Sequence, residues 1–475
     1  MGKTTNSNVI GQITNFSIQY NLSVLSIAIK FMTSASDKLI AEDDTKTNPD
    51  FPEPAWASET LLSMVFTGTI IGMSLLGYVG DAYGRRIGLL SSVTLVLIGS
   101  LCSALLSWGS SDTVYLVICI FRLIIGIGVG GMYPNGAALS AEGASEGEDD
   151  GERVGWSFFW QQPGAMTPAI VAYLMLLIPS TVSSVTSIQF RIMLALGAIP
   201  AAIVWIAAYR LKHDQPDDKS EAKHPFAVAA AHPQYHKPLA GTTSSWFLWD
   251  ITCYGTAVFT PAILSAIFVD SSTLSNIIWQ SLVLNLIATA GVYAAIIMIK
   301  RFGATWIQFW GFLFMAAIFG LFALLFLISP TGLEYYKFGT FCLLSFSQGW
   351  GPNLSTYVLP AQLFPSNIKS TFHGLSAAAG KAGAVVGTLL FMPVKLWVGI
   401  QGVMWANFIV CVLGAIFTKY CLPDTSEKAL HELRKEWDLI DKQARISKSF
   451  SGDEMESSVN GDDNDSGKSL LALAM

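Results

Sequence analysis

Long apolar stretches separated by short polar segments recur along the whole chain. Each stretch holds about 20 apolar residues, enough for a helix to cross the ~30 Å hydrocarbon core of a bilayer. Transmembrane β-strands are about half as long and alternate apolar with polar residues, which these stretches do not do. The pattern predicts an all-α membrane protein with twelve transmembrane helices, at residues 9–32, 59–79, 88–108, 113–140, 154–178, 189–210, 243–268, 275–300, 304–328, 335–362, 371–394 and 401–421.

The composition agrees with a membrane protein. Of the 475 residues, 52% are hydrophobic and only 13% are charged, whereas soluble domains are about 25% charged. The six cysteines lie in or at the ends of the apolar stretches and have no metal-binding spacing. We therefore interpret them as packing residues and expect neither a metal nor a cofactor.

One long polar segment, residues 212–241, divides six predicted spans from six. We predict an N-terminal six-helix bundle at 1–211, a central cytoplasmic loop at 212–241 and a C-terminal six-helix bundle at 242–422. A cytoplasmic tail at 423–475 follows, with an amphipathic helix over 423–443 and then an acidic segment that we expect to be disordered. Two six-helix halves resemble the plan of major facilitator superfamily transporters.

Lysine and arginine residues are concentrated in alternate loops. Because short loops rich in these residues stay on the cytoplasmic side, the bias predicts that both termini are cytoplasmic. Arg85 and Lys300 then lie inside, and little beyond Lys38 and Lys337 lies outside. We expect an integral multi-pass protein of the plasma membrane that acts as a monomer.

The segment GYVGDAYGRR at 77–86 joins the second and third predicted spans. Glycine permits close backbone approach, and Asp81 can hold Arg85 or the N-terminus of an opposite helix. The segment resembles the loop motif of the superfamily. This resemblance implies a gating role for Gly77, Asp81, Gly84, Arg85 and Arg86.

The matching loop of the second half reads IKRFGATWIQ at 299–308. Lys300 stands at the usual acidic position, and Ala304 and Thr305 replace the arginines. We expect this second gate to be weakened or differently built. In the fourth predicted span, Arg122 begins an R-x-x-x-G pattern. Two interpretations of Arg122 are open: it interacts with a proton-binding carboxylate, or it reaches to the outer interface.

The segment WFLWDITCYG at 246–255 places a carboxyl group within the seventh predicted span. Trp246, Asp250 and Tyr254 are four residues apart and share one helix face. An ionised carboxylate costs roughly 2.5–3.5 kcal/mol at a helix centre, which favours a functional role. A protonated Asp250 can donate to an anion, whereas an ionised one repels it. The alternative is a structural ion pair, with Lys381 as a candidate partner.

Further stretches carry a resemblance to the phosphate:proton symporter family of the major facilitators, over most of residues 60–430. They are GMYPNGAALSAE (131–142), FFWQQPG (158–164) and a long run that contains Gly351-Pro352-Asn353, Phe364-Pro365, Ser370-Thr371, His373-Gly374 and Gly380-Lys381. The resemblance implies transport of inorganic phosphate by alternating access, with Asp250 as the candidate proton carrier. It also implies that the substrate-binding residues are Tyr133, Gln161, Trp246, Asp250, Tyr254 and Asn353, with Lys381 as the nearby cation.

Two departures leave the coupling ion open. Met132 stands where the family has an aspartate, and Ile18-Gln19-Tyr20-Asn21 replaces a D-x-Y-D pattern in the first span. Gln362 also stands where a glutamate is usual. The protein can therefore couple phosphate to H⁺ through Asp250 alone, to Na⁺, or to no ion. Its substrate can equally be an organic phosphate or a similar oxyanion.

Other classes of function fit the sequence less well. A non-transporting phosphate sensor that signals through the tail is the main alternative, because both relay carboxylates of the family are missing. Paired carboxylates, histidine clusters and a nucleophile triad are absent from the sequence, so we predict that the protein is not an enzyme. The basic residues form no patch suited to nucleic acid. The expected partners are phosphate, a coupling cation and the lipid bilayer.

Overall fold

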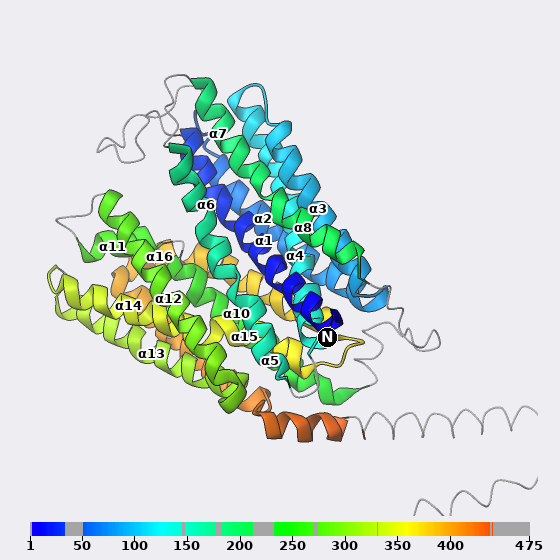
Figure 1. Ribbon diagram of the computed structural model, residues 1–475. Coiled ribbons are helices and arrows are strands. Elements are labelled where there is room, and N and C mark those ends of the chain that lie inside the picture. The colour runs from blue at the N-terminus through cyan, green and yellow to red at the C-terminus, as the bar shows by residue number, and fades with distance from the viewer. Residues whose placement is uncertain are drawn as a thin grey trace, which may run out of the picture. The chain divides into compact units, whose positions relative to one another are not determined.

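The computed structural model describes residues 2–33, 51–144, 148–176, 183–211, 232–257, 259–268, 274–329, 331–437 and 439. Within these residues the chain forms helices and connecting turns and contains no strand. Figure 1 shows this all-helical arrangement. The predictions made for 212–231 and for the acidic end of the tail fall outside the described residues.

The described helices follow one another in two sets of similar length. The first set is α1 (Gly2–Thr33), α2 (Ala57–Ala82), α3 (Arg85–Leu105), α4 (Ser111–Glu142), α5 (Asp150–Phe159), α6 (Gln161–Leu176), α7 (Ser183–Leu196) and α8 (Ala198–Tyr209). The second set is η1 (Pro233–Tyr235), α10 (His236–Ala257), α11 (Thr260–Ile267), α12 (Leu274–Phe302), α13 (Ala304–Ile328), α14 (Glu334–Trp350), α15 (Pro352–Leu363) and α16 (Lys369–Cys421).

Within the described residues, each of the twelve predicted spans overlaps a helix. The fifth, sixth, seventh and tenth spans are each split in two, as α5/α6, α7/α8, α10/α11 and α14/α15. The eleventh and twelfth form α16, where Gly399 at φ 73° interrupts the helical backbone. Seven segments of the described helices are long and apolar enough to cross a membrane by length and composition alone.

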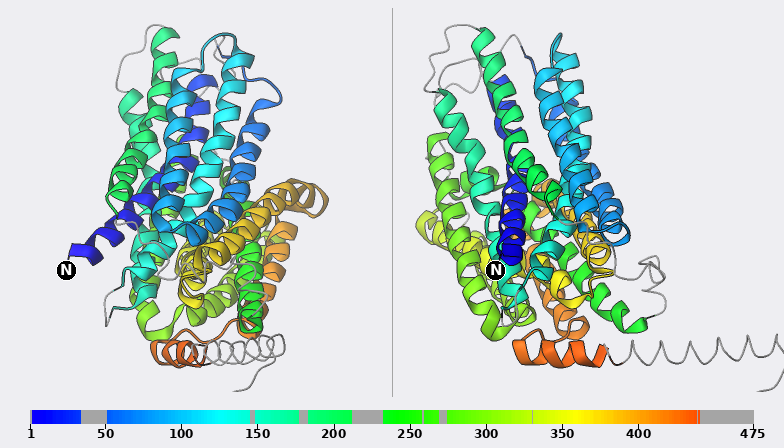
Figure 2. Two further views of the ribbon diagram at one scale, coloured as in Figure 1. Left: turned by 90° about the vertical axis from the view of Figure 1, so that its right-hand side faces the viewer. Right: turned by 45° about the vertical axis from the view of Figure 1, so that its right-hand side comes forward.

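The two sets of helices form two halves, α1–α8 and α10–α16, as Figures 1 and 2 show. Glycines bring α2 of the first half into backbone contact with α16 of the second. A Cβ atom on Gly77 would lie 2.6 Å from the carbonyl oxygen of Ser370, and one on Gly374 would lie 2.0 Å from that of Met73. Neither position has space for a side chain, so these glycines set how closely the halves approach.

The two halves use the same turn between their second and third spans. Gly84 precedes α3 with φ 94° and ψ 154°, and Gly303 precedes α13 with φ 79° and ψ 155°. Positive φ is easily adopted only by glycine, which explains why glycine remains in both loops although their charged residues differ. We call the end of the helix bundle that carries the turn at Gly84 the Gly84 end.

The chain divides into two compact units, residues 1–427 and 428–475. Residues 427–437 are helical, which falls within the amphipathic helix predicted over 423–443. The boundaries predicted at 211 and 241 flank a segment that lies mostly outside the described residues. That division of the chain therefore stays a prediction.

Candidate functional site

Asp250 on α10 and Lys381 on α16 form a buried ion pair. The Nζ atom of Lys381 lies 3.1 Å from Oδ2 of Asp250, and the two residues are only 3% and 2% exposed. The same Nζ donates to the Tyr254 hydroxyl at 2.8 Å. Asp250 and Tyr254 meet Lys381 together because four residues separate them on α10, so that both lie on one face.

Aromatic rings surround this pair. Lys381 Nζ lies 4.4 Å from the ring centroid of Tyr254 and 5.9 Å from that of Tyr133. Trp246, one helical turn before Asp250, is 4% exposed, and its ring lies 5.5 Å from the His373 ring, between centroids. The Lys381 ammonium donates to two oxygens and faces two aromatic rings. These contacts hold it in one place although it has a single carboxylate partner among them.

The first half contributes neutral groups to the same region. Tyr133 on α4 and Gln161, the first residue of α6, are both buried. Gln161 Nε2 donates to Asn15 Oδ1 at 2.7 Å. The ring of Tyr254 meets Phe66 of α2 edge-on at 5.4 Å between centroids, so both halves contribute to the site.

Of the seven residues expected to bind substrate, Asp250, Tyr254 and Lys381 are joined by direct bonds, and the Tyr133 ring faces Lys381 at 5.9 Å. Trp246 and Gln161 lie in the same region through shared neighbours, Tyr357 for Trp246 and Asn15, which also bonds to Tyr357, for Gln161. Asn353, the second residue of α15, is half-buried and stands apart from the contacts described here. The break between α14 and α15 at Gly351 and Pro352 precedes it directly.

Three residues of this region were not predicted from the sequence, namely Asn15, Tyr357 and His373. Each is 0% exposed. The Tyr357 ring lies 5.0 Å from the His373 ring and 6.4 Å from that of Trp246, between centroids. A polar side chain within an apolar span was the one available signal for Asn15, since its partners lie up to 342 residues away along the chain.

The arrangement suits an anion with several oxygens. The second half supplies a cation, Lys381, and a carboxyl that can lose or gain a proton, Asp250. The first half supplies the neutral groups of Tyr133 and Gln161. Neutral donors recognise oxygens without adding charge, and a lysine acts as a point donor. Among the described residues, no group of three or more His, Cys, Asp or Glu side chains is arranged to hold a metal ion.

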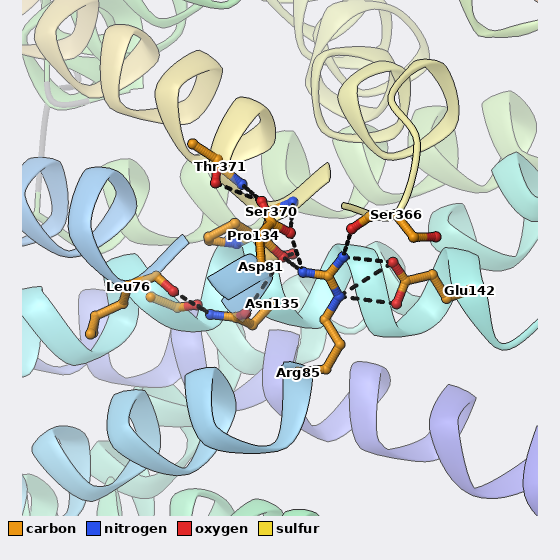
Figure 3. A network of polar contacts seen from close by, with 10 residues as sticks. Leu76, Asp81, Arg85, Pro134, Asn135, Glu142, Ser366, Ser370 and Thr371 are labelled. Carbon is orange, nitrogen blue, oxygen red and sulfur yellow. Dashed lines mark hydrogen bonds and ion pairs between the residues drawn. The ribbon is translucent and has the colours of Figure 1, made fainter. Parts of the chain in front are cut away.

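At the Gly84 end, Arg85 joins the two halves through a polar network (Figure 3). Its guanidinium forms an ion pair with Asp81 and donates to Glu142 from Nε at 3.0 Å and from Nη2 at 2.7 Å. It also donates to the Ser366 carbonyl and, at 2.7 Å, to Ser370 Oγ. One side chain thus ties α2, α3 and α4 to the segment before α16.

Asp81 holds the first turn of α16. The backbone N–H groups of Ser370 and Thr371 donate to its carboxylate at 3.0 and 2.6 Å, and the Thr371 hydroxyl donates at 2.6 Å. A carboxylate at a helix N-terminus satisfies free N–H groups and the positive end of the helix dipole. The network closes the Gly84 end between the halves.

The matching loop of the second half is built from hydroxyl groups. Thr305 Oγ1 donates to the Pro423 carbonyl at 2.8 Å, and the Thr305 backbone N–H donates to Thr425 Oγ1 at 3.0 Å. Gln308 Nε2 donates to Thr418 Oγ1 at 3.0 Å. These contacts stay within the second half and fix the chain that follows α16, whereas the Arg85 network crosses between the halves.

Neither interpretation of Arg122 fits the structure. The side chain is 0% exposed, so it does not reach an interface. Its Nη1 donates to the backbone carbonyl of Asn21 at 2.9 Å, while Asn21 Oδ1 accepts from Ser100 at 2.9 Å. Asn21 stands where the family has a carboxylate, and it offers Arg122 a backbone carbonyl oxygen in place of a negative charge.

Comparison with known proteins agrees with this architecture. The model of the family described as "Sugar (and other) transporter" matches residues 7–212 and 244–437. The inorganic phosphate transporter PT2 of Toxoplasma gondii is 34% identical over 411 residues, which cover 85% of this chain and 69% of that protein. The probable inorganic phosphate transporter 1-6 of Arabidopsis thaliana is 26% identical over 488 residues, 90% of this chain and 93% of that protein.

Solved structures of similar fold include the proton:xylose symporter XylE bound to 6-bromo-6-deoxy-D-glucose. Its TM-score is 0.75 at 18% sequence identity, with 92% of this chain and 99% of that chain covered. FucP in the outward conformation has a TM-score of 0.68 at 12% identity, with 87% and 99% covered. At these identities the likeness establishes the fold, which is the twelve-helix fold of the major facilitator superfamily.

The relatives found by sequence are named as transporters and not as enzymes. The family match covers both halves of the chain and leaves out most of the segment between them. Its fold and its apolar helices make the protein an integral membrane protein. The chain belongs to the sugar (and other) transporter family of the major facilitator superfamily.

Proposed function

We propose that the protein is a secondary transporter of inorganic phosphate that works by alternating access and is coupled to protons through Asp250. The observation that carries this proposal is the buried pair of Lys381 and Asp250, 3.1 Å apart, beside the neutral groups of Tyr133 and Gln161. The names of the relatives, among them PT2 of Toxoplasma gondii, support phosphate as the substrate.

The pair supplies a reason for coupling. An ionised Asp250 occupies Lys381 and repels an approaching anion. When a proton binds the Asp250 carboxylate, the negative charge is lost and Lys381 can donate to a phosphate oxygen instead. Tyr254, Trp246, Tyr133 and Gln161 then donate to the remaining oxygens. Loss of the proton on the other side of the membrane restores the ion pair and expels the anion.

The two halves have unequal parts in this cycle. Asp250, Tyr254 and Trp246 lie on α10 and Lys381 lies on α16, so the charged groups belong to the second half. Phosphate bound between these groups and Tyr133 would draw the halves together around it. Asn353 would complete the site when α15 moves at its break after Gly351.

The orientation follows from the distribution of Lys and Arg. In our proposal the Gly84 end faces the cytoplasm, both termini are cytoplasmic, and the protein acts as a monomer in the plasma membrane. The Asp81–Arg85 network then closes the cytoplasmic side, so that the site is reached from outside before the network opens.

A second candidate is phosphate transport without proton coupling. The observation in its favour is Asn21, which cannot titrate and gives Arg122 only its backbone carbonyl. The same site is also compatible with coupling to Na⁺, with transport of an organic phosphate and with a sensor that does not transport. These functions differ in the uptake of phosphate that each allows.

Uptake of radiolabelled phosphate into proteoliposomes, with pH and Na⁺ gradients imposed separately, tests the proposal. We expect accumulation driven by an inward proton gradient and independent of Na⁺. Equilibration without accumulation under either gradient would favour uncoupled transport. Uptake that depends on Na⁺ alone would show that Na⁺, and not H⁺, is the coupling ion. Binding of phosphate without any uptake would favour the sensor. Competition by organic phosphates and sulfate would define the substrate class.

A further inference from the structure

A hydrogen bond joins the two halves next to the candidate site. Asn15 Nδ2 on α1 donates to the Tyr357 hydroxyl on α15 at 3.1 Å. Both residues are 0% exposed, so water does not compete for this bond. Leaving a polar group buried in this way without a hydrogen-bond partner costs several kcal/mol of free energy. The two side chains lie 342 residues apart in sequence and belong to different halves.

The amide of Asn15 has more acceptors than hydrogens. Besides Tyr357, its Nδ2 lies 2.9 Å from Ser157 Oγ and 3.1 Å from the Gly11 carbonyl. An Nδ2 group carries two hydrogens, so three acceptors share them. When Tyr357 moves away, both hydrogens keep an acceptor within the first half. The bond between the halves can therefore break without leaving the hydrogens of the Asn15 amide unpaired.

The Tyr357 ring contacts both halves as well. In the first half it lies 5.0 Å from the Phe158 ring and 6.0 Å from the Tyr133 ring, between centroids. In the second half it lies 5.0 Å from His373, whose Nε2 forms a 3.0 Å hydrogen bond with the Tyr357 carbonyl oxygen. Tyr357 is thus fixed to the second half through its backbone and reaches the first half through its ring and hydroxyl.

Asn15 is also bonded to the candidate site. Its Oδ1 accepts from Gln161 Nε2 at 2.7 Å, the shortest of the Asn15 side-chain bonds. Gln161 holds the Asn15 amide in the orientation that directs Nδ2 to Tyr357, because the oxygen and the nitrogen of one amide cannot turn independently. A ligand that takes the Gln161 donor removes this constraint.

We propose that Asn15 and Tyr357 form a latch that holds the halves together beside the site, and that anion binding to Gln161 loosens it. Asn15 and Tyr357 are positioning residues in this scheme and touch no substrate. The first part of the proposal is independent of what the protein carries. The second part rests on the proposed function, because it requires phosphate to bind Gln161.

The latch is tested by the distance between spin labels on the two halves. Cysteines at Tyr83 and Lys300, both exposed near the turns at Gly84 and Gly303, carry the labels in purified protein reconstituted into nanodiscs, with native cysteines replaced. Tyr357→Phe removes only the hydroxyl group. One neutral hydrogen bond between the halves is lost. In the absence of phosphate, we therefore expect the ratio of molecules with a long distance between the labels to molecules with a short one to rise about 2- to 10-fold.

Tyr20→Phe is the matched control. The Tyr20 hydroxyl is equally buried and donates to the Met193 carbonyl at 3.0 Å, but both residues lie in the first half. We expect this variant to keep the wild-type distances. If Tyr357→Phe also keeps them, there is no latch.

Asn15→Leu gives a second route to the same result. Asn15→Leu also removes the Asn15 bonds to Gly11, Ser157 and Gln161, so it should shift the distances at least as far as Tyr357→Phe. The double variant Asn15→Leu/Tyr357→Phe should match Asn15→Leu, because the bond that Tyr357→Phe removes is already absent there. If the two changes add in full, the residues act separately and the latch is excluded. Because the double-variant comparison concerns the interaction, general loosening by either substitution does not mimic it.

Inorganic phosphate tests the second part. We expect phosphate to raise the proportion of long distances in the wild-type protein and to raise it less in Tyr357→Phe, where the latch is already absent. An equal rise in both proteins would overturn the link from Gln161 to the latch. No response to phosphate in either protein would count against phosphate as the ligand and hence against the link, while the result without phosphate still decides whether the latch exists.

Discussion

Lys381 is the only described cation within hydrogen-bond distance of Asp250, and the two atoms Nζ and Oδ2 lie 3.1 Å apart inside the second half. Their partners across the site, Tyr133 and Gln161, are neutral. A buried ion pair of this kind adds little stability when both partners are present, but removing one partner is costly. The pair is therefore better suited to a switch than to a structural support.

The first prediction concerns Asp250→Asn, which keeps the shape of the side chain and removes its charge and titration. If Asp250 carries the proton, this variant should fail to accumulate phosphate against a gradient while phosphate exchange stays partly intact. Both are measured in proteoliposomes with radiolabelled phosphate. Asp250→Glu, which retains the titratable group, is the control and should keep some accumulation. Full accumulation by Asp250→Asn under a pH gradient would exclude the proposed role.

The second prediction concerns Lys381→Gln. A hydrogen bond from a charged group contributes about 1.5–3 kcal/mol, so we expect phosphate affinity to fall about 10- to 100-fold, measured by equilibrium binding. The variant also leaves the Asp250 carboxylate without its cation, which costs up to about 3–5 kcal/mol of unfolding free energy if it stays ionised.

The double variant Asp250→Asn/Lys381→Gln separates these two effects. Because it contains no uncompensated charge, its thermal unfolding temperature should return towards the wild-type value, while phosphate binding stays weak. A double variant that is less stable than Lys381→Gln would show that the two side chains do not act as a pair.

The third prediction concerns Arg85→Lys. Arg85 bonds to Asp81, Glu142 and the segment before α16 from three nitrogens at once, and one ammonium group cannot reproduce that geometry. Losing two charge-assisted bonds weakens closure of the Gly84 end. We expect the transport rate to fall at least about tenfold, with the protein still folded.

Arg86→Lys is the neighbouring control. The Arg86 guanidinium lies 5.2 Å from the Tyr209 ring centroid, and a lysine can keep a cation–π contact there. Transport by this variant should stay close to that of the wild type. Equal losses in the two variants would point to loop charge, and not to the Arg85 network, as the important property.

The sequence was sufficient to predict the helices and one face of the site. The lengths of the apolar stretches located the twelve spans, and the spacing of Trp246, Asp250 and Tyr254 placed three side chains on one face of α10. These features depend on neighbours along the chain. The family resemblance, and not periodicity, brought in Tyr133 and Gln161 from the other half.

The remaining contacts depend on packing between distant segments. Asn15 meets Ser157 because Gly11 lets α1 approach α4 and α5: a Cβ atom there would lie 2.1 Å from Ser140 Oγ and 2.6 Å from Ser157 Oγ. Nothing in the local pattern around Gly11 or Asn15 specifies these partners. Arg122 was misjudged for the same reason, since the hydrogen-bond partner that it has among the described residues is a backbone carbonyl on another helix.

The last prediction concerns the orientation in the membrane, and it uses two exposed positions at opposite ends of the helix bundle. Tyr83, 59% exposed, precedes Gly84, and Trp397, 89% exposed, lies beside Gly399 at the turn within α16. Helix α16 begins against Asp81 and reverses at Gly399, so the two positions face opposite sides of the membrane.

The Lys and Arg bias places Tyr83 in the cytoplasm. A cysteine at Tyr83 should therefore resist a membrane-impermeant maleimide in intact cells and react after permeabilisation, whereas a cysteine at Trp397 should react in both. The parent protein, with its six native cysteines replaced, is the control for background labelling. The reverse pattern would invert the topology and place the Arg85 network on the outer side.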